Sequence, residues 1–520
     1  MTIPGADRVP ADLLAAFTDY ERAILSNDLD ALDGWFAPGA ETMRGDGAGL
    51  LVGHDAIHAF RSLRGGVSKR HIETIQYREL APDVALVVSV SRFEIGGRGL
   101  QTQVWQLFDE GWRITAAHVS PRPEPFNRAI WRTVGDPLWQ GAWEGPLEGL
   151  TVAVKDLFAI KGYRIGAGNP SYLESVKAES HTAPAVSDLL RAGASLRGIA
   201  RTDEFAYSIA GNNAHYGTPP NGAVPGALPG GSSSGPASAV STGQADIGLA
   251  TDTAGSIRVP ASYQGLWGLR TTHELVPRQG LLPLAQSFDT VGWLTRDGET
   301  LQRVADWCLS YDGSDSTEHV YGESGDELPW RFLVPSEALD AADEATRSAF
   351  DELVSSLPVE TVSIGDLAEY HEPFRTVQGA EAWRNNGEWL RDHPGATGDA
   401  VASRFRAAAE ITPDAERAAR SRLVELKSRI DALLADAVLI LPTVPGPAPS
   451  RTVSADRLDA IRTATLRMTT PAAVAGVPAL SAPLLTVGRA PVGVCLISRA
   501  GTDIALVRLA RRLAAQVGVA

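Results

Sequence analysis

The chain has 520 residues, of which 44% are hydrophobic and 21% charged, a balance that is typical of a folded globular protein and excludes a disordered or fibrous one. Lys and Arg number 47 against 62 Asp and Glu, and the formal net charge of −15 disfavours nucleic acid and anionic membrane surfaces as partners. Two cysteines, Cys308 and Cys495, are too few for a disulfide framework or a four-cysteine zinc site. The N-terminus lacks a signal-peptide pattern and no run approaches about 18 apolar residues, so we expect a cytoplasmic protein.

The first 120 residues predict a small α+β domain. Apolar residues recur with nearly helical period over 11–25, and a second, shorter helix is expected over 30–36. Segments rich in β-branched and apolar residues then predict strands over 84–93, 101–108 and 112–119.

A proline-rich segment follows this domain. The sequence Pro-Arg-Pro-Glu-Pro over 121–125 favours an extended linker, which we expect over 121–144. From 145 to 520, apolar strands such as 150–158 alternate with helices such as 182–192, a pattern that predicts a second domain with a mixed or parallel α/β sheet. The C-terminal third adds a helical stretch, a strand and an amphipathic helix at 401–436, 438–441 and 503–517.

A lysine interrupts the otherwise apolar run over 151–158. Burial disfavours the charged form of a lysine, lowers its pKa and makes a neutral amine available as a base at Lys155. The alternative is a lysine at a strand end that reaches solvent or pairs with Asp156.

Two Gly/Ser-rich segments offer hydroxyl groups and backbone donors. In Pro229-Gly-Gly-Ser-Ser-Ser-Gly235, the glycines permit unusual backbone geometry beside a ligand, although the same pattern also fits a phosphate-binding loop or a linker. In Thr251-Asp-Thr-Ala-Gly-Ser-Ile-Arg-Val-Pro260, a serine follows a flexible Ala-Gly turn, where successive N–H groups can form an oxyanion hole.

Taken together, Lys155, Gly230-Gly-Ser-Ser-Ser-Gly235 and Asp252-Thr-Ala-Gly-Ser-Ile-Arg258 resemble the amidase signature family of serine hydrolases. The similarity extends over roughly 145–510. It implies an α/β fold, an α/β/α sandwich around a central mixed sheet, with no metal and no organic cofactor.

The resemblance also implies a Ser-cisSer-Lys triad. Ser256 would be the nucleophile that accepts the acyl group, Ser232 the bridging serine and Lys155 the final proton acceptor, so that an amide is cleaved to carboxylate and ammonia through an acyl-enzyme. The oxyanion would be held by backbone N–H groups of Thr253, Ala254, Gly255 and Ser256. Ala254 stands where many members of the family have glycine, a change that the turn tolerates if its φ stays negative.

Within the family, the segments 166–170, 206–219 and 286–293 look most like the indole-3-acetamide hydrolase type. This similarity implies a small, uncharged substrate such as an aryl acetamide. The candidates for substrate-binding residues are Tyr207, Asn212 and His215, with Ser233 as a supporting hydrogen-bond donor or acceptor. Ordinary loop packing is the alternative role for these side chains.

The front domain resembles the cone-shaped SnoaL-like domains, specifically the AtzH-like group, through the segments 51–61 and 110–120. Such domains enclose a pocket and often dimerise through the sheet, so we expect a homodimer. Members found beside amidases suggest carboxylated ureas and biuret-type compounds as a rival substrate class.

Four other interpretations of the sequence are possible. His54-Asp-Ala-Ile-His58 imitates a zinc-protease helix, but no third ligand is evident. Gly231-Ser-Ser-Ser-Gly235 satisfies the nucleophile-elbow pattern centred on Ser233, but a turn-like segment precedes it where that motif needs a strand. A non-catalytic amidase-like scaffold is disfavoured by the intact lysine and serines. An amidotransferase subunit would require a tRNA-handling partner.

Overall fold

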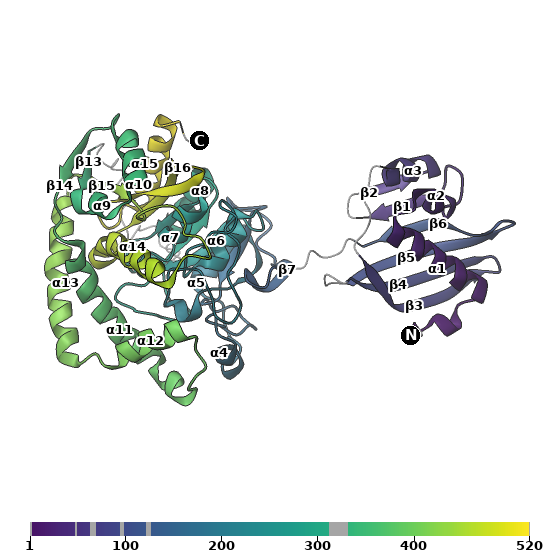
Figure 1. Cartoon of the computed structure of the whole chain (residues 1–520), viewed down its shortest axis with the longest axis horizontal. Helices are drawn as coiled ribbons and strands as arrows, with labels where there is room; N and C mark the ends of the chain where they lie inside the picture. The colour runs from purple at the N-terminus through teal and green to yellow at the C-terminus, as the bar shows by residue number, and fades with distance from the viewer. Residues whose placement is uncertain are drawn as a thin grey trace. The chain divides into compact units, whose positions relative to one another are not determined.

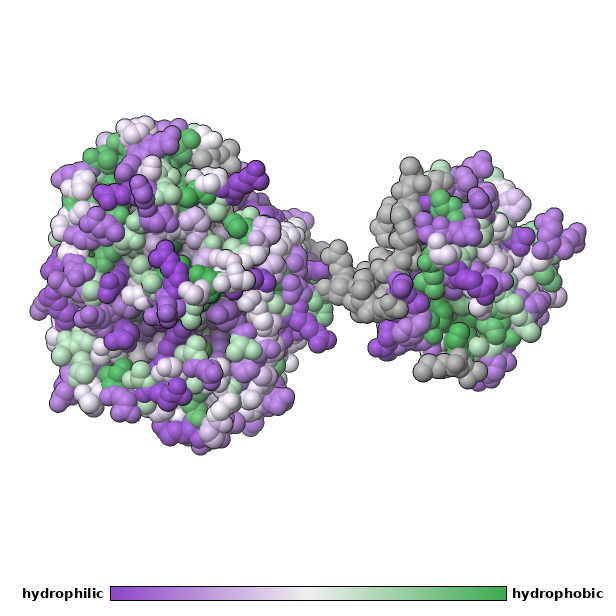
Figure 2. Space-filling view, in the orientation of Figure 1, coloured by the Kyte–Doolittle hydropathy of each residue, from purple (hydrophilic) through white to green (hydrophobic). Residues whose placement is uncertain are grey.

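The computed structural model describes residues 3–46, 49–62, 69–93, 98–120, 126–310 and 331–518. The chain divides into two compact units, Met1–Phe126 and Asn127–Ala520, which are described separately below (Figure 1). The Pro-Arg-Pro-Glu-Pro segment at 121–125 lies outside the described residues. Hydrophilic and hydrophobic residues are interspersed on the visible face of both units (Figure 2). Within the described residues, no helix is both long and apolar enough to cross a membrane.

The front unit is a six-stranded sheet with helix α1 (Ala11–Ser26) lying across it (Figure 1). The strand order is β2-β1-β6-β5-β4-β3. Leu13 and Phe17 of α1 are buried together with Trp105 and Ile114 of the sheet, because apolar side chains at i and i+4 lie on one face of a helix. The remaining elements are α2 (Leu29–Gly34), β1 (Met43–Asp46), β2 (Gly49–Val52), α3 (His54–Ser62), β3 (Arg70–Ala81), β4 (Val84–Phe93), β5 (Arg98–Phe108) and β6 (Gly111–Val119), after a 3₁₀ turn at Ala6–Arg8.

The second unit is built on one mixed sheet in the order β14-β13-β15-β17-β16-β11-β12-β10-β8-β9-β7. Strand β8 runs parallel to its two neighbours, β9 and β10, whereas β10 is antiparallel to β12. The strands are β7 (Trp131–Trp139), β8 (Thr151–Lys155), β9 (Ser195–Ala200), β10 (Ile247–Asp252), β11 (Trp267–Arg270), β12 (Thr290–Thr295), β13 (Phe332–Pro335), β14 (Val359–Val362), β15 (Val438–Pro442), β16 (Ala479–Val487) and β17 (Ala490–Ile497).

Helices cover both faces of this sheet. Successive residues of β15 show the division: Val438 and Ile440 join one buried cluster, and Leu439 and Leu441 join the other, because side chains alternate along a strand. The helices are α4 (Pro170–Ser175), α5 (Pro184–Arg191), α6 (Ser234–Ser241), α7 (Arg258–Gln264), α8 (Gly298–Ser310), α9 (Ser336–Ala341), α10 (Glu344–Val354), α11 (Leu367–Asp392), α12 (Asp399–Ala409), α13 (Pro413–Leu433), α14 (Ala455–Ala475) and α15 (Asp503–Gln516), with a 3₁₀ turn at Glu204–Ala206.

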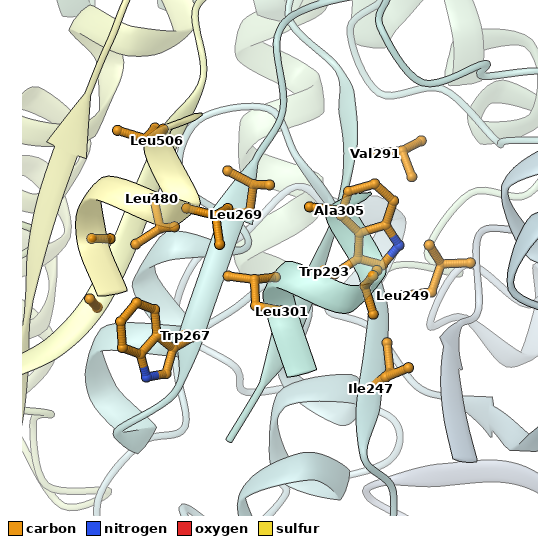
Figure 3. Close-up of a cluster of buried hydrophobic side chains, with 14 of the residues drawn as sticks. Ile247, Leu249, Trp267, Leu269, Val291, Trp293, Leu301, Ala305, Leu480 and Leu506 are labelled. Carbon is orange, nitrogen blue, oxygen red and sulfur yellow. The ribbon is translucent and has the colours of Figure 1, made fainter. Parts of the chain in front are cut away.

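The larger of the two buried clusters lies beneath α8 and α15. Figure 3 shows Leu249, Leu269 and Trp293 from three neighbouring strands packed against Leu301 of α8 and Leu506 of α15. The other cluster packs the sheet against α11, α13 and α14, and α11 and α13 run side by side (Figure 1). The expected α/β/α sandwich with a central mixed sheet is therefore confirmed.

The expected linker at 121–144 needs a correction. This range contains β7, an edge strand of the large sheet that pairs antiparallel with β9. Pro137 lies inside this strand, preceded by a cis peptide bond from Asp136. An edge strand accepts a proline because its outer N–H groups need no partner in the sheet, so the proline-rich composition did not exclude a strand here.

Candidate active site

Lys155 is the last residue of β8, an inner strand flanked by β9 and β10, and its side chain has no exposed surface. Its Nζ donates hydrogen bonds to the hydroxyl oxygens of Ser232 (2.8 Å), Ser233 (2.9 Å) and Thr251 (2.8 Å). Asp156, the alternative partner considered from the sequence, instead pairs with Arg132 at 2.9 Å. The lysine is therefore surrounded by neutral hydroxyl groups rather than by a carboxylate in direct contact.

This environment changes the basicity of Lys155. Burial lowers its pKa to about 7, and the more distant carboxylates of Asp203, Asp252 and Asp289 oppose the shift only in part. At neutral pH a substantial fraction of the amine is therefore unprotonated. The hydroxyl of Ser233 already donates to the carbonyl oxygen of Thr251 (3.2 Å), so Ser233 can only accept from the lysine. Ser233 thus belongs to the hydrogen-bond shell of Lys155.

Ser232 is held on the loop that precedes α6, and the Gly231–Ser232 peptide bond is cis. Its carbonyl oxygen accepts hydrogen bonds from the backbone N–H of Asp203 (3.0 Å) and the hydroxyl of Thr202 (2.9 Å). A Cβ atom at Gly231 would lie 2.4 Å from Oδ2 of Asp203, so this position requires glycine. The carboxylate of Asp203 therefore packs directly against the serine loop.

Ser256 lies in the turn between β10 and α7, and it is buried. The backbone N–H of Ser233 donates to the carbonyl oxygen of Ser256 at 3.3 Å, which joins the two serine segments. The fold thus brings together the three segments that carry Lys155, Ser232 and Ser256.

The backbone of this turn provides unoccupied donors. Among the described residues, the N–H groups of Thr253, Ala254 and Ser256 have no acceptor, although all three residues are buried. Such groups are costly unless a ligand satisfies them, so they are suited to bind an oxyanion. Gly255, also expected to contribute, instead donates its N–H to Oδ1 of Asp252 (2.9 Å).

Glycine is required at position 255 for two reasons. Its φ is +124°, and a Cβ atom there would lie 3.0 Å from Oγ1 of Thr469 in α14. The same Thr469 hydroxyl donates to the carbonyl oxygen of Ala254 (2.5 Å). Ala254 itself is not among the residues with positive φ, so alanine is tolerated there.

Asp252 anchors the turn and was not assigned a role from the sequence. Its carboxylate accepts from the side chains of Arg258 (Nε 3.0 Å, Nη2 2.9 Å) and Arg270 (Nη1 3.1 Å) as well as from the N–H of Gly255. Burial alone would raise the pKa of Asp252, but the two guanidinium groups outweigh it and hold the pKa well below its usual range. Asp252 and Arg258 lie six residues apart in the same motif, and this pair is the sequence feature from which the ion pair could have been predicted.

Asp289 supports the other end of the turn. Its Oδ1 accepts from the hydroxyl of Thr253 at 2.7 Å, and burial raises its pKa to about 6. Asp289 also lines a cavity of about 520 Å³ together with Val276, Arg278, Leu281 and Gln286. The cavity therefore lies next to the segment that carries Ser256.

Three of the four candidate substrate-binding residues lie on one loop, whereas Ser233 lies beside Lys155. Tyr207 is almost fully buried and its ring packs on Phe405, with ring centres 5.1 Å apart. Asn212 is exposed, and His215 directs Nε2 to Oε1 of Glu204 at 2.8 Å. The buried neighbour Asn213, missed from the sequence, ties the loop to the carbonyl groups of Gly168 and Thr202. Of the expected set, Tyr207 is the one whose ring packs into the protein interior.

The nucleophile-elbow and zinc-protease patterns lack the structural context that each of these motifs requires. The residues before Ser233 form turns and bends, with no strand leading into a nucleophile elbow. In the part of the chain that is described, no three His, Cys, Asp or Glu side chains gather as a metal site would require. His58 of the zinc-like sequence instead hydrogen-bonds through Nδ1 to Asp33.

Comparisons with known proteins agree with this architecture. Residues 136–507 match the family described as Amidase, and residues 5–124 match the family described as AtzH-like. Amidase 1 of Arabidopsis thaliana is 35% identical over 398 residues, which cover 71% of this chain and 93% of that protein. A crystal structure of an amidase superposes with a TM-score of 0.64 at 31% identity, over 72% of this chain and 86% of the other.

A second solved structure comes from an inhibitor-bound vestigial protein complex that bears on the origins of an s-triazine catabolic enzyme. It superposes with a TM-score of 0.66 at 28% identity, over 72% of this chain and 86% of that chain. The fold and the relatives define the class of the protein as an amidase enzyme. More specifically, the chain belongs to the amidase signature family and carries an AtzH-like domain at its front.

Proposed function

We propose that this amidase hydrolyses a small carboxamide to a carboxylate and ammonia through Ser256, Ser232 and Lys155. The observation that carries the proposal is the buried Lys155, with its pKa lowered to about 7 and its Nζ 2.8 Å from the hydroxyl oxygen of Ser232. A neutral amine at that position can accept a proton at neutral pH.

In the first half of the reaction, the neutral amine of Lys155 takes the proton of Ser232 while Ser232 takes the proton of Ser256. The Ser256 oxygen attacks the amide carbon and forms a tetrahedral intermediate. The proton then returns through the same pair of serines to the departing nitrogen, and ammonia leaves an acyl-enzyme on Ser256. Water attacks this ester by the same proton path, which releases the carboxylate and restores the serine.

The developing oxyanion would be stabilised by backbone donors of the Ser256 turn. The unoccupied N–H groups of Thr253, Ala254 and Ser256 support this role. Donors of this kind act in a buried site where water does not weaken them, and losing one typically costs about 10² to 10³ in rate. Gly255 shapes the turn through its N–H bond to Asp252 rather than binding the oxyanion.

The test is ammonia release from a panel that contains indole-3-acetamide, phenylacetamide, short aliphatic amides, biuret and carboxylated ureas. Wild type should turn over at least one class, and Ser256→Ala should lose activity to background with an unchanged melting temperature. Ser428→Ala, on the exposed face of α13, is the matched control and should retain wild-type activity. Activity retained by Ser256→Ala would assign the chemistry to another residue, and an inactive wild type would favour the scaffold or a partner-dependent enzyme.

A further inference from the structure

A cluster of positive side chains lies beside Tyr207, outside the groups used in the mechanism. It consists of Arg375 on α11, Arg404 on α12, and Arg462 and Arg467 on α14, with His371 of α11 among them. We call it the arginine cluster. Two consecutive helices, α11 and α12, and the more distant α14 supply it, so the tertiary fold assembles it.

Two carboxylates, Asp203 and Asp459, act on Arg404 and compensate the positive charge of this cluster only in part. Among the described residues, the carboxylate in ion-pair contact with these arginines is that of Asp459, 3.7 Å from Arg462 and 74% exposed. Burial lowers the pKa of Arg462 to about 10, and Arg404 and Arg375 add to that shift. Burial likewise lowers the pKa of His371 to about 4, with Arg375, Arg462 and Arg467 as further causes. The imidazole is therefore neutral at pH 7.

Two polar atoms of the cluster also lack partners. Nε of Arg462 and Nδ1 of His371 are buried and have no hydrogen-bond acceptor or donor among the described residues. Burying these two atoms unpaired costs free energy, and the nearby guanidinium groups of Arg404 and of the exposed Arg375 and Arg467 add repulsion to that cost. A bound anion would remove both penalties, because guanidinium groups bind carboxylates through strong, charge-assisted hydrogen bonds.

The cluster connects directly to the candidate active site. Nη1 of Arg404 donates to the carbonyl oxygen of Tyr207 at 2.7 Å, on the loop that begins at Asp203 beside the Ser232 segment. Arg462 precedes Thr469 by seven residues of α14, and Thr469 donates to the carbonyl oxygen of Ala254 in the Ser256 turn. Residues seven apart share one helix face and are about 10 Å apart along the axis.

We propose that the arginine cluster binds a carboxylate on the acyl part of the substrate, so that the preferred substrates are short amides with a negative charge at the far end. This inference rests on the proposed function and narrows its substrate class. A separation of about 10 Å along α14, shortened by the reach of the arginine side chains, suits an acyl chain of a few carbons. The carboxylated class is favoured over neutral aryl acetamides.

The test compares succinamate with its uncharged isostere 4-oxopentanamide at pH 7.5, by ammonia release. Wild type should show a kcat/KM at least tenfold higher for succinamate. In Arg462→Gln the ratio of the two kcat/KM values should fall at least tenfold, mainly through the KM for succinamate. Arg457→Gln, an exposed arginine on the same helix, makes the same charge change and should keep the wild-type ratio. A wild-type ratio of one or less, or equal ratios in the two variants, would overturn the inference.

The experiments distinguish a failure of the carboxylate site from a failure of the proposed amidase reaction. Ser256-dependent turnover of neutral amides alone would leave the proposed function intact and reject the carboxylate site. If no amide is turned over, calorimetric titration of wild type with succinate tests whether the arginine cluster binds a carboxylate. Binding that weakens at least tenfold in Arg462→Gln supports the anion site without catalysis, and no binding rejects it.

Discussion

The chain contains five lysines, and Lys155 is the one at the end of an inner strand, with no exposed surface. The same desolvation that makes burial costly lowers its pKa to about 7, which supplies the base that the proposed reaction needs. The neighbouring hydroxyl groups form hydrogen bonds with the amine of Lys155, but because they are neutral they do not stabilise its charged form as a carboxylate would.

The pH dependence of activity follows from this shift. Because Lys155 must be neutral to accept a proton, kcat/KM should rise with pH through an apparent pKa near 7 and level off above pH 8. Lys155→Ala should lose about 10² to 10⁴ in rate, with the largest loss at neutral pH. The measurement is kcat/KM from pH 6.5 to 9; Asp289, whose pKa is raised to about 6, completes its titration near pH 7, so the rise above pH 7 is assigned to Lys155. Lys161→Ala, an exposed lysine, is the control; a flat profile for wild type would contradict the assignment of the base.

At the scale of elements, the turn between β10 and α7 depends on buried ion pairs. Asp252, Arg258 and Arg270 have no exposed surface, and the two arginines bind the carboxylate that also caps the N–H of Gly255. Removing one member of such a set leaves the others buried without compensation. The position of Ser256 therefore depends on residues outside the proposed triad.

We expect Asp252→Ala to reduce the free energy of unfolding by about 3 to 5 kcal/mol, because Arg258 and Arg270 lose their counter-charge inside the protein. Amidase activity should fall with it, since the Ser256 turn loses its anchor. Asp436→Ala removes an exposed carboxylate that pairs with Arg331 and should change stability by less than about 1 kcal/mol. Denaturant unfolding and ammonia release are the measurements, and equal effects of the two substitutions would reject the anchoring role.

At the scale of the whole molecule, the front unit has one sheet face that α1 does not cover. Side chains alternate along β4 and β5, so Ala85 and Val87 point into the core, and the outer face carries the paired positions Leu86 and Val104, Val88 and Thr102, and Val90 and Leu100. Apart from Thr102, the side chains at these six positions are apolar. They are half-buried, except for Leu100, which is exposed. The homodimer expected from the sequence remains a prediction, and this face is a suitable surface for it.

The dimer is tested by the mass in solution. Light scattering after size exclusion should give about 110 kDa, twice the 55.1 kDa of the chain. Val88→Glu places a charge in the middle of the outer face and should produce a species of about 55 kDa with the front unit still folded. Glu79→Lys changes charge at an exposed position of β3 and should leave the mass at twice that of the chain. A monomeric wild type would reject the dimer.

The fold class, the family and the segments that carry Lys155, Ser232 and Ser256 could be predicted from the chain alone, because apolar residues, glycines and serines form recognisable local patterns there. The same patterns did not predict β1, β2 and β3 of the front unit, and β7 was mistaken for linker, because an edge strand tolerates proline and its pairing with β9 is not local.

The side chains that support the site are brought together by contacts between distant segments. Asp252, Arg270 and Thr469 meet at the Ser256 turn from three different elements, and burial, which fixes the pKa of Lys155, is a property of the packed sheet. The arginine cluster arises in the same way from α11, α12 and α14. Local sequence does not specify contacts between distant segments or the exclusion of water around them. The pKa of Lys155 and the contacts at the Ser256 turn therefore follow from the tertiary structure.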